Sequence, residues 1–165
     1  MLRVFCTFML ILTPFFTFQP IEAQDIGESG NPLPRFVSIA TDKIFMRTGP
    51  GRNYPIQWVY TSTKLPLKVI EEYGPWRRVV DFQRETGWMH RSLLSSRRTA
   101  MIIGGPQSLR NKPSITANIN AHLQEGVIAI IEECGKNWCK LQHPQVTGWL
   151  PRAGIYGVLD GEVFD

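Results

Sequence analysis

The sequence predicts an all-β protein made of two tandem small β-barrels, and three observations favour this class. Short apolar runs separated by turn residues fill residues 36–158, and no window of a dozen residues keeps a helical period. A frame of Glu-Glu, a glycine turn, Trp, an apolar run and Thr-Gly-Trp occurs at residues 71–88 and again at 132–149, with offsets of 61 or 62. Each copy, about sixty residues long, is the size of a small domain that folds alone.

The N-terminus has the pattern of a secretory signal peptide at residues 1–23. Arg3 supplies a positive head, residues 4–18 are almost wholly apolar, and a polar stretch then ends on the small residue Ala23. The rival interpretation is a membrane anchor, but the apolar run is shorter than the roughly 20 residues of a spanning helix. We therefore expect cleavage near Ala23, a periplasmic or secreted location, and no membrane span in the mature chain.

Residues 24–34 are rich in Gly, Pro, Ser and Asn, and they predict a flexible linker. The first repeat is expected at residues 35–98, with a wide Pro/Gly loop at 48–55 and tight turns at 74–75 and 83–86. Its strands are expected at residues 36–39, 44–46, 56–60, 65–73, 76–82 and 87–90. The glycines before Trp88 and Trp149 suggest a bend where two backbones approach closely.

The second repeat is expected at residues 99–165 in the same order. Its strands are expected at residues 99–103, 108–110, 119–123, 127–134, 138–141 and 148–150, with a short closing turn and strand at 153–158. The four tryptophans Trp76, Trp88, Trp138 and Trp149 are expected to serve mainly the barrel cores, because large rings in so small a domain are mostly buried.

The motifs of both copies resemble a known family. Leu/Met-Arg, a Gly/Pro/Ser loop, Glu-x-x-Gly-x-Trp-x-x-Val/Leu and Gly-Trp are similar to the bacterial SH3-like domain. Two copies after a signal peptide, the linker 92–99 and the tail Tyr156-Gly157-Val158 resemble an exported SH3-like family of alphaproteobacteria. The resemblance covers residues 36–163. It implies two SH3-like barrels that act as non-enzymatic binding modules, often toward peptidoglycan or peptides.

Two cysteines flank a four-residue turn in the second copy. Cys134 and Cys139 should face each other across a hairpin, close enough for a disulfide in an oxidising compartment. The first copy carries Tyr73 and Arg77 at that turn. Two alternatives use the same residues: a Cys139 nucleophile with His143 as base, or a zinc site that lacks a clear fourth ligand. We expect the disulfide, no enzymatic activity, no cofactor and no metal.

The charge is uneven along the chain. Residues 35–100 carry 12 Lys and Arg against 5 Asp and Glu, a net charge of +7, whereas residues 101–165 have a net charge of −1. The basic side chains of residues 35–100 either form a simply solvated surface or form a patch that binds an anionic partner. Such a partner would be a cell-wall polymer, an anionic lipid surface or an acidic protein face. Nucleic acid is not expected as a partner outside the cytoplasm.

The resemblance also implies where a ligand binds. The usual groove of an SH3-like barrel lies between the wide first loop and the next hairpin. In the first copy the loop carries Arg52 and Tyr54, and the hairpin carries Tyr73, Trp76 and Arg77, which suit an anionic or peptide-like ligand. The matching loop of the second copy, residues 111–117, has no aromatic side chain. We expect the first copy to bind a cell-wall polymer or an envelope protein; a structural adaptor in an envelope complex is the alternative.

Overall fold

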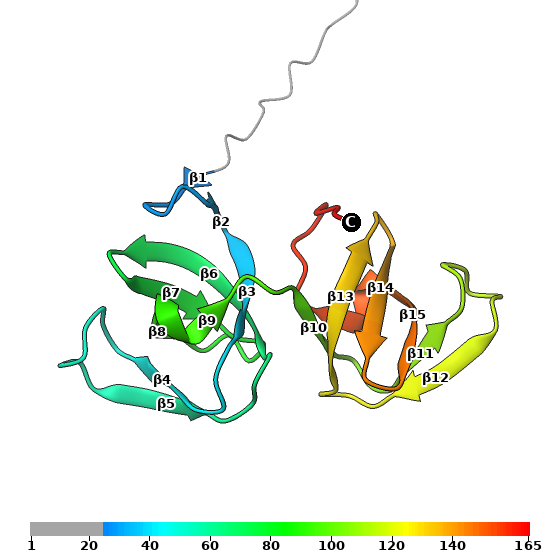
Figure 1. Ribbon diagram of the computed structural model, residues 1–165, viewed down its shortest axis with the longest axis horizontal. Coiled ribbons are helices and arrows are strands. Elements are labelled where there is room, and N and C mark those ends of the chain that lie inside the picture. The colour runs from blue at the N-terminus through cyan, green and yellow to red at the C-terminus, as the bar shows by residue number, and fades with distance from the viewer. Residues whose placement is uncertain (1–24) are drawn as a thin grey trace, which may run out of the picture.

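The computed structural model describes residues 25–165, so the signal peptide expected at residues 1–23 lies outside the described part. Two seven-stranded antiparallel sheets, each curled into a small barrel-like unit, stand side by side (Figure 1). The expected all-β class with two tandem SH3-like units is confirmed. Among the described residues, no helix has the length and apolar character needed to cross a membrane.

The first sheet has the strand order β5-β4-β8-β7-β6-β3-β9. Its elements are β3 (Arg35–Ile39), β4 (Ile44–Arg47), β5 (Ile56–Tyr60), β6 (Pro66–Tyr73), β7 (Trp76–Val80), β8 (Thr86–His90), the short 3-10 helix η1 (Arg91–Leu93) and β9 (Leu94–Ser95). β6 and β7 form the long central hairpin, and β4 and β5 are the arms of the wide first loop.

The second sheet repeats this layout in the order β12-β11-β15-β14-β13-β10-β16. Its elements are β10 (Thr99–Ile102), β11 (Gln107–Arg110), β12 (Ile119–Leu123), β13 (Ile128–Cys134), β14 (Trp138–His143), β15 (Val146–Pro151), the 3-10 helix η2 (Arg152–Gly154) and β16 (Ile155–Tyr156). A register shift interrupts β6 between Val69 and Glu71, and the same shift interrupts β13 between Ile131 and Glu133.

The strand register corrects one expected match between the copies. Cys134 pairs with Cys139 across β13 and β14, and the corresponding pair across β6 and β7 is Glu72 with Arg77, both at an offset of 62. Tyr73, the residue expected to match Cys134, lies one position after the residue that does match it. The reason is that the Glu-Glu sequences of the two copies differ by one position in the strand register. Tyr73 pairs with Trp76 instead.

One glycine in each barrel, Gly87 or Gly148, lets two strands approach closely enough for the barrel to close. A Cβ at Gly87 would lie 2.5 Å from Met46 Cγ and 2.8 Å from the carbonyl oxygen of Arg47. A Cβ at Gly148 would lie 2.6 Å from the carbonyl oxygen of Arg110. Only glycine lets the backbones of these strands come so close. This agrees with the close approach expected at the glycines before Trp88 and Trp149.

The N-terminal segment differs from the flexible linker expected at residues 24–34. β1 (Asp25–Ile26) and β2 (Pro32–Leu33) form a small hairpin. Both the backbone N–H and the hydroxyl of Ser29 donate to the Glu72 carboxylate, at 2.6 and 2.8 Å. A buried carboxylate in the first barrel therefore holds a segment whose composition alone predicts no structure.

The two units share part of their cores. Met101 of β10 is only 5% exposed and packs in the hydrophobic cluster of the first barrel. Tyr156 donates a hydrogen bond to the carbonyl of Val80 (3.0 Å), and its ring meets Phe36 edge-on with centroids 5.1 Å apart. The Thr99 hydroxyl donates to the carbonyl of Lys64 at 2.7 Å. These contacts hold the second barrel against the first.

Candidate functional site

The wide first loop, residues 48–55, is closed at its base by an arginine. Arg47 Nη1 donates to the carbonyl of Tyr54 at 2.7 Å. The Tyr54 ring lies against Gly49, where a Cβ would come within 2.3 Å of the ring. In the second copy Arg110 Nη1 makes the same bond to the carbonyl of Ala117, also at 2.7 Å. The arginine that ends β4 and the arginine that ends β11 therefore shape the first loop of their own copies.

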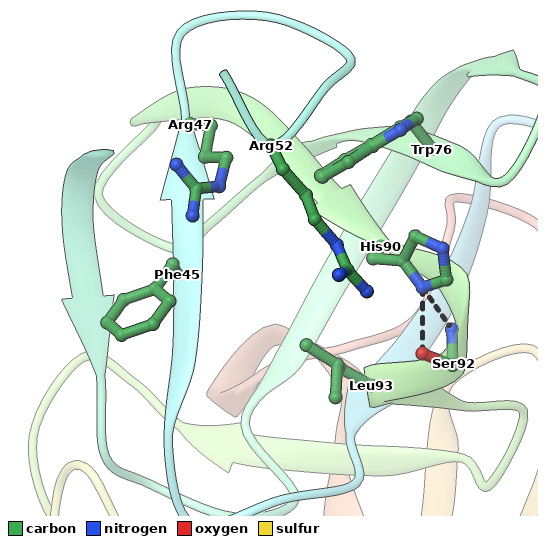
Figure 2. Close-up of a pocket in the computed structure, with 7 residues that line it drawn as sticks. All are labelled: Phe45, Arg47, Arg52, Trp76, His90, Ser92 and Leu93. Atoms are coloured by element: carbon green, nitrogen blue, oxygen red, sulfur yellow. Dashed lines mark hydrogen bonds between the residues drawn. The ribbon is translucent and has the colours of Figure 1, made fainter. Parts of the chain in front are cut away.

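A pocket of about 180 Å³ opens between this loop and the β7–β8 region of the first barrel. Figure 2 shows Arg52 reaching into the middle of the group, with Phe45 and Arg47 on one side and Trp76 and His90 on the other. The seven lining residues are Phe45, Arg47, Arg52, Trp76, His90, Ser92 and Leu93. We call this set the aromatic groove.

The far wall of the aromatic groove is rigidly built. Trp76 and His90 are opposite each other in the β7–β8 register, and their rings meet edge-on with centroids 5.3 Å apart. The backbone N–H of Ser92 donates to His90 Nδ1 (3.3 Å), and the Ser92 hydroxyl lies 2.7 Å from the same atom (Figure 2). Because Nδ1 accepts the backbone bond, the neutral ring carries its proton on Nε2, which is left for a ligand.

The near wall and the loop supply positive charge. Arg47 lies over the Phe45 ring with its Cζ 5.9 Å from the centroid, and Arg52 comes from the loop above it. The lining includes two guanidinium groups and no carboxylate among the described residues. Aromatic rings beside guanidinium groups can stack against a flat group and hydrogen-bond a carboxylate.

The expected ligand residues are only partly brought together. Arg52 and Trp76 line the aromatic groove. Tyr54 packs on its own loop, and Tyr73 is 61% exposed at the tip of β6; neither lines the groove.

Arg77 lies away from the aromatic groove, inside the first barrel. It is 5% exposed, and its Nε lies 3.1 Å from Glu72 Oε1 while Nη1 donates to the carbonyls of Gly74 and Trp76. The alternation of β7 explains this, because Trp76 and Arg77 point to opposite faces of the strand.

Comparison with known proteins gives the family. The family model described as the bacterial SH3 domain matches residues 40–96 and again residues 104–157. The chain belongs to the bacterial SH3 domain family. No curated protein matches the sequence. Among solved structures, the chain is similar to NlpC2 from Trichomonas vaginalis, at 9% identity and a TM-score of 0.34. The match covers 74% of this chain and 48% of that chain, so this chain spans about half its length.

Bacterial SH3 domains are binding modules, often for the cell wall. The two SH3 copies of this chain differ at the groove. By the strand register, Ser108 stands in the second copy where Phe45 stands in the first, and Pro151 stands where His90 stands. The second SH3 copy thus keeps an arginine, Arg110, and a tryptophan, Trp138, at the matching positions, but it has neither the phenyl ring nor the imidazole.

Sequence reasoning missed most of the groove. Phe45, Arg47, His90, Ser92 and Leu93 line it without having been assigned to it. A signal for His90 existed, because the residue across a tight hairpin from Trp76 must share its face of the sheet. Ser92 and Leu93 belong to η1, whose position depends on the closed barrel and has no local sequence signal.

The cysteines are paired as expected. Cys134 and Cys139 lie opposite each other across β13 and β14 with their Sγ atoms at disulfide distance, and both are fully buried. The cysteine-hydrolase alternative needs a free thiol at Cys139, and the paired sulfur offers none. His143 is four residues further along the same strand, roughly 13 Å at the rise of a β-strand. The described residues contain no cluster of three or more His, Cys, Asp or Glu side chains placed to hold a metal.

Proposed function

We propose that this protein is an exported, non-enzymatic SH3 binding module whose first copy engages peptidoglycan or an envelope peptide or protein through the aromatic groove. The observation that carries the proposal is the convergence of Arg47, Arg52, Trp76 and His90 on one pocket of the first copy. The second copy has Arg110 and Trp138 at the matching positions but no counterpart of Phe45 or His90, so we assign it to support.

The chemistry of the groove favours a ligand with a carboxylate next to a flat or apolar group. Arg52 would hydrogen-bond the carboxylate, Trp76 would pack on the neighbouring group, and His90 Nε2 would donate a further bond. Peptide stems of the cell wall and acidic protein segments both have this chemistry. A site built from exposed charges should bind modestly, and its affinity should fall as salt rises.

Export rests on residues 1–23 and agrees with the buried cysteine pair, which fits an oxidising compartment. The mature chain would begin near residue 24 and work in the periplasm or outside the cell.

A pulldown tests the proposal directly. The mature protein is incubated with purified sacculi and, in parallel, with detergent-solubilised envelope extract, each at low and high salt. Sacculus binding that weakens with salt supports a polymer ligand. Retention of specific envelope proteins without sacculus binding supports a protein partner and favours the adaptor alternative. No binding to either contradicts the proposed function.

A further inference from the structure

The two SH3 copies carry an equivalent pair of arginines at the strand edge. Arg35 pairs with Val69 of β6, and the carbonyl of Arg98 accepts from Ile131 of β13 at the same register position, 63 residues later. Arg91 is the first residue of η1, and Arg152 is the first residue of η2. The fold therefore places two guanidinium groups near the same edge in both copies.

In the second copy these arginines hold the C-terminal tail, residues 157–165. Arg98 forms a two-nitrogen ion pair with Glu162, with Nη2 2.9 Å from Oε2, and also donates to the carbonyl of Gly157 at 2.9 Å. Arg152 donates to the backbone carbonyls of Leu159 and Glu162.

The last residues of the tail extend this contact. The Phe164 ring lies 4.5 Å from Arg98 Cζ, and the backbone of Phe164 exchanges two hydrogen bonds with Cys134. The tail, drawn in red beside β13 in Figure 1, is an acidic peptide seated on the arginine pair.

The first copy has the arginines without the peptide. A pocket of about 400 Å³ lies between the N-terminal hairpin, β3 and β9. Its lining contains three guanidinium groups, several hydroxyl and amide groups and an apolar floor. The residues are Arg35, Arg77, Arg91, Ser29, Asn31, Ser95, Ser96, Phe36, Val37 and Leu94. We call it the arginine pocket.

The charges around the arginine pocket are unbalanced. Glu72 is bonded to both Arg35 (2.5 Å) and Arg77 (3.1 Å), and Glu28 accepts from the N–H of Gly74 at 2.8 Å. The side chain of Arg91 has no hydrogen bond or ion pair with residues 25–165. Burial lowers the pKa of Arg77; the Glu72 carboxylate opposes this, and repulsion from Arg35 and Arg91 lowers the pKa further. The N-terminal hairpin meets Glu72 where the tail meets Cys134. It gives the Arg91 side chain no hydrogen-bond acceptor, whereas the tail gives Arg152 two backbone carbonyls.

We propose that the arginine pocket binds an acidic segment of a partner protein, with backbone carbonyls of the segment on Arg91 and a Glu or Asp side chain on the outer face of Arg35. The bound tail of the second copy shows this chemistry within the same chain. There Arg98, the counterpart of Arg35, binds the Glu162 carboxylate, and Arg152, the counterpart of Arg91, binds backbone carbonyls. The hydroxyls of Ser95 and Ser96 would bond the segment's backbone, and Phe36 and Leu94 would contact its apolar side chains. This site is separate from the aromatic groove and does not depend on it.

The test uses the mature chain and a synthetic peptide with the sequence of residues 157–165, added in excess and followed by backbone amide shifts. The parent protein should show shifts at Arg91 and at residues 94–96. Arg91→Gln should weaken binding about tenfold, the effect of losing a charge-assisted hydrogen-bonded pair. Arg84→Gln, which removes an exposed charge on the β7–β8 turn, should change it less than twofold.

Several results would overturn the assignment. Equal weakening by Arg91→Gln and Arg84→Gln would mean that only net charge matters. Shifts confined to Arg152 and Cys134 would mean that the added peptide merely exchanges with the protein's own tail. Binding of inorganic phosphate as tight as that of the peptide would reduce the pocket to a general anion site. If a peptide with Gln in place of Glu162 binds as well as the acidic one, the carboxylate has no role. Sacculus binding by Arg91→Gln should be unchanged, because the arginine pocket and the aromatic groove are separate sites. This measurement therefore distinguishes failure of the arginine-pocket proposal from failure of the proposed function.

Discussion

Glu72 forms an ion pair with Arg77 across β6 and β7, at the register position where the second copy has a disulfide. Both links are buried and join the same two points of the central hairpin. They act differently, however. A buried ion pair gains little once desolvation is subtracted, whereas a disulfide stabilises by restricting the unfolded chain. Glu72 also anchors the N-terminal hairpin through Ser29, and the disulfide cannot do this.

The disulfide should contribute modestly to the second barrel. Reducing Cys134–Cys139 should lower the free energy of unfolding by about 2 kcal/mol, because the closed loop is short. Urea denaturation with and without reductant measures this difference. Peptide mapping of freshly isolated protein without reductant should find the two cysteines linked, and two free thiols would contradict the assignment.

Removing the carboxylate of the buried ion pair should cost more. Glu72→Gln leaves Arg77 buried without its counter-charge, which should destabilise the first barrel by about 3–5 kcal/mol. The matched control is Glu71→Gln, since Glu71 is an exposed neighbour that pairs with Arg78 at 3.1 Å; its loss should cost at most about 1 kcal/mol. Urea denaturation of both variants decides, and equal effects would mean that the buried pair contributes nothing special.

The carboxylates of Glu72 and Glu162 make the free energy of unfolding depend on pH in the acid range. Burial by itself raises the pKa of Glu72, but hydrogen bonds from Ser29 and Arg35 outweigh it and hold the pKa below its usual value. Burial likewise opposes ionisation of Glu162, and bonds from Arg98 and the N–H of Leu159 again lower its pKa. A lowered folded pKa stabilises the fold above the unfolded value near 4.5, and this stability is lost as the pH falls through the folded value.

We therefore expect stability to be flat from neutral pH to about pH 5 and to fall below about pH 4. Thermal unfolding across this range measures the effect. Glu162→Gln and Glu72→Gln should each remove part of this acid response. An unchanged acid response in both variants would show that other groups control it.

The shared core predicts that the barrels unfold together. Met101→Ala, a change in β10 of the second barrel, should destabilise the first barrel by about 2–5 kcal/mol, as large-to-small core substitutions do. The control is Ile115→Ala, which alters a side chain that is 75% exposed. Amide exchange of β3 and β6 measures the first barrel specifically, and equal exchange in the two variants would show that the barrels are independent.

The repeat made the fold predictable from sequence. Alternating apolar residues, the glycine turns and the Gly-Trp pairs indicated both sheets, because each is a local signal of strand or turn. The match of Tyr73 to Cys134 was wrong because it aligned the two Glu-Glu pairs, which differ by one position in the strand register of the two copies. The N-terminal hairpin was missed because its partner, Glu72, lies 43 residues from Ser29.

The candidate site was only half predictable for the same reason. Arg52 and Trp76 belong to segments that the resemblance already places at a groove. Arg77 does not line the aromatic groove because the alternation of β7 turns it inward, where it pairs with Glu72. His90 and Ser92 reach the groove through a hydrogen bond between neighbouring elements, which composition does not reveal.

The most direct test of the account is sacculus and envelope-protein binding by Arg52→Gln, compared at low salt with Arg84→Gln. Each variant removes one exposed arginine of the first copy, but only Arg52 lines the aromatic groove. We predict that Arg52→Gln weakens binding about tenfold while Arg84→Gln stays within twofold of the parent. Equal binding by all three folded proteins would contradict the groove assignment and leave the basic surface as a solvated face.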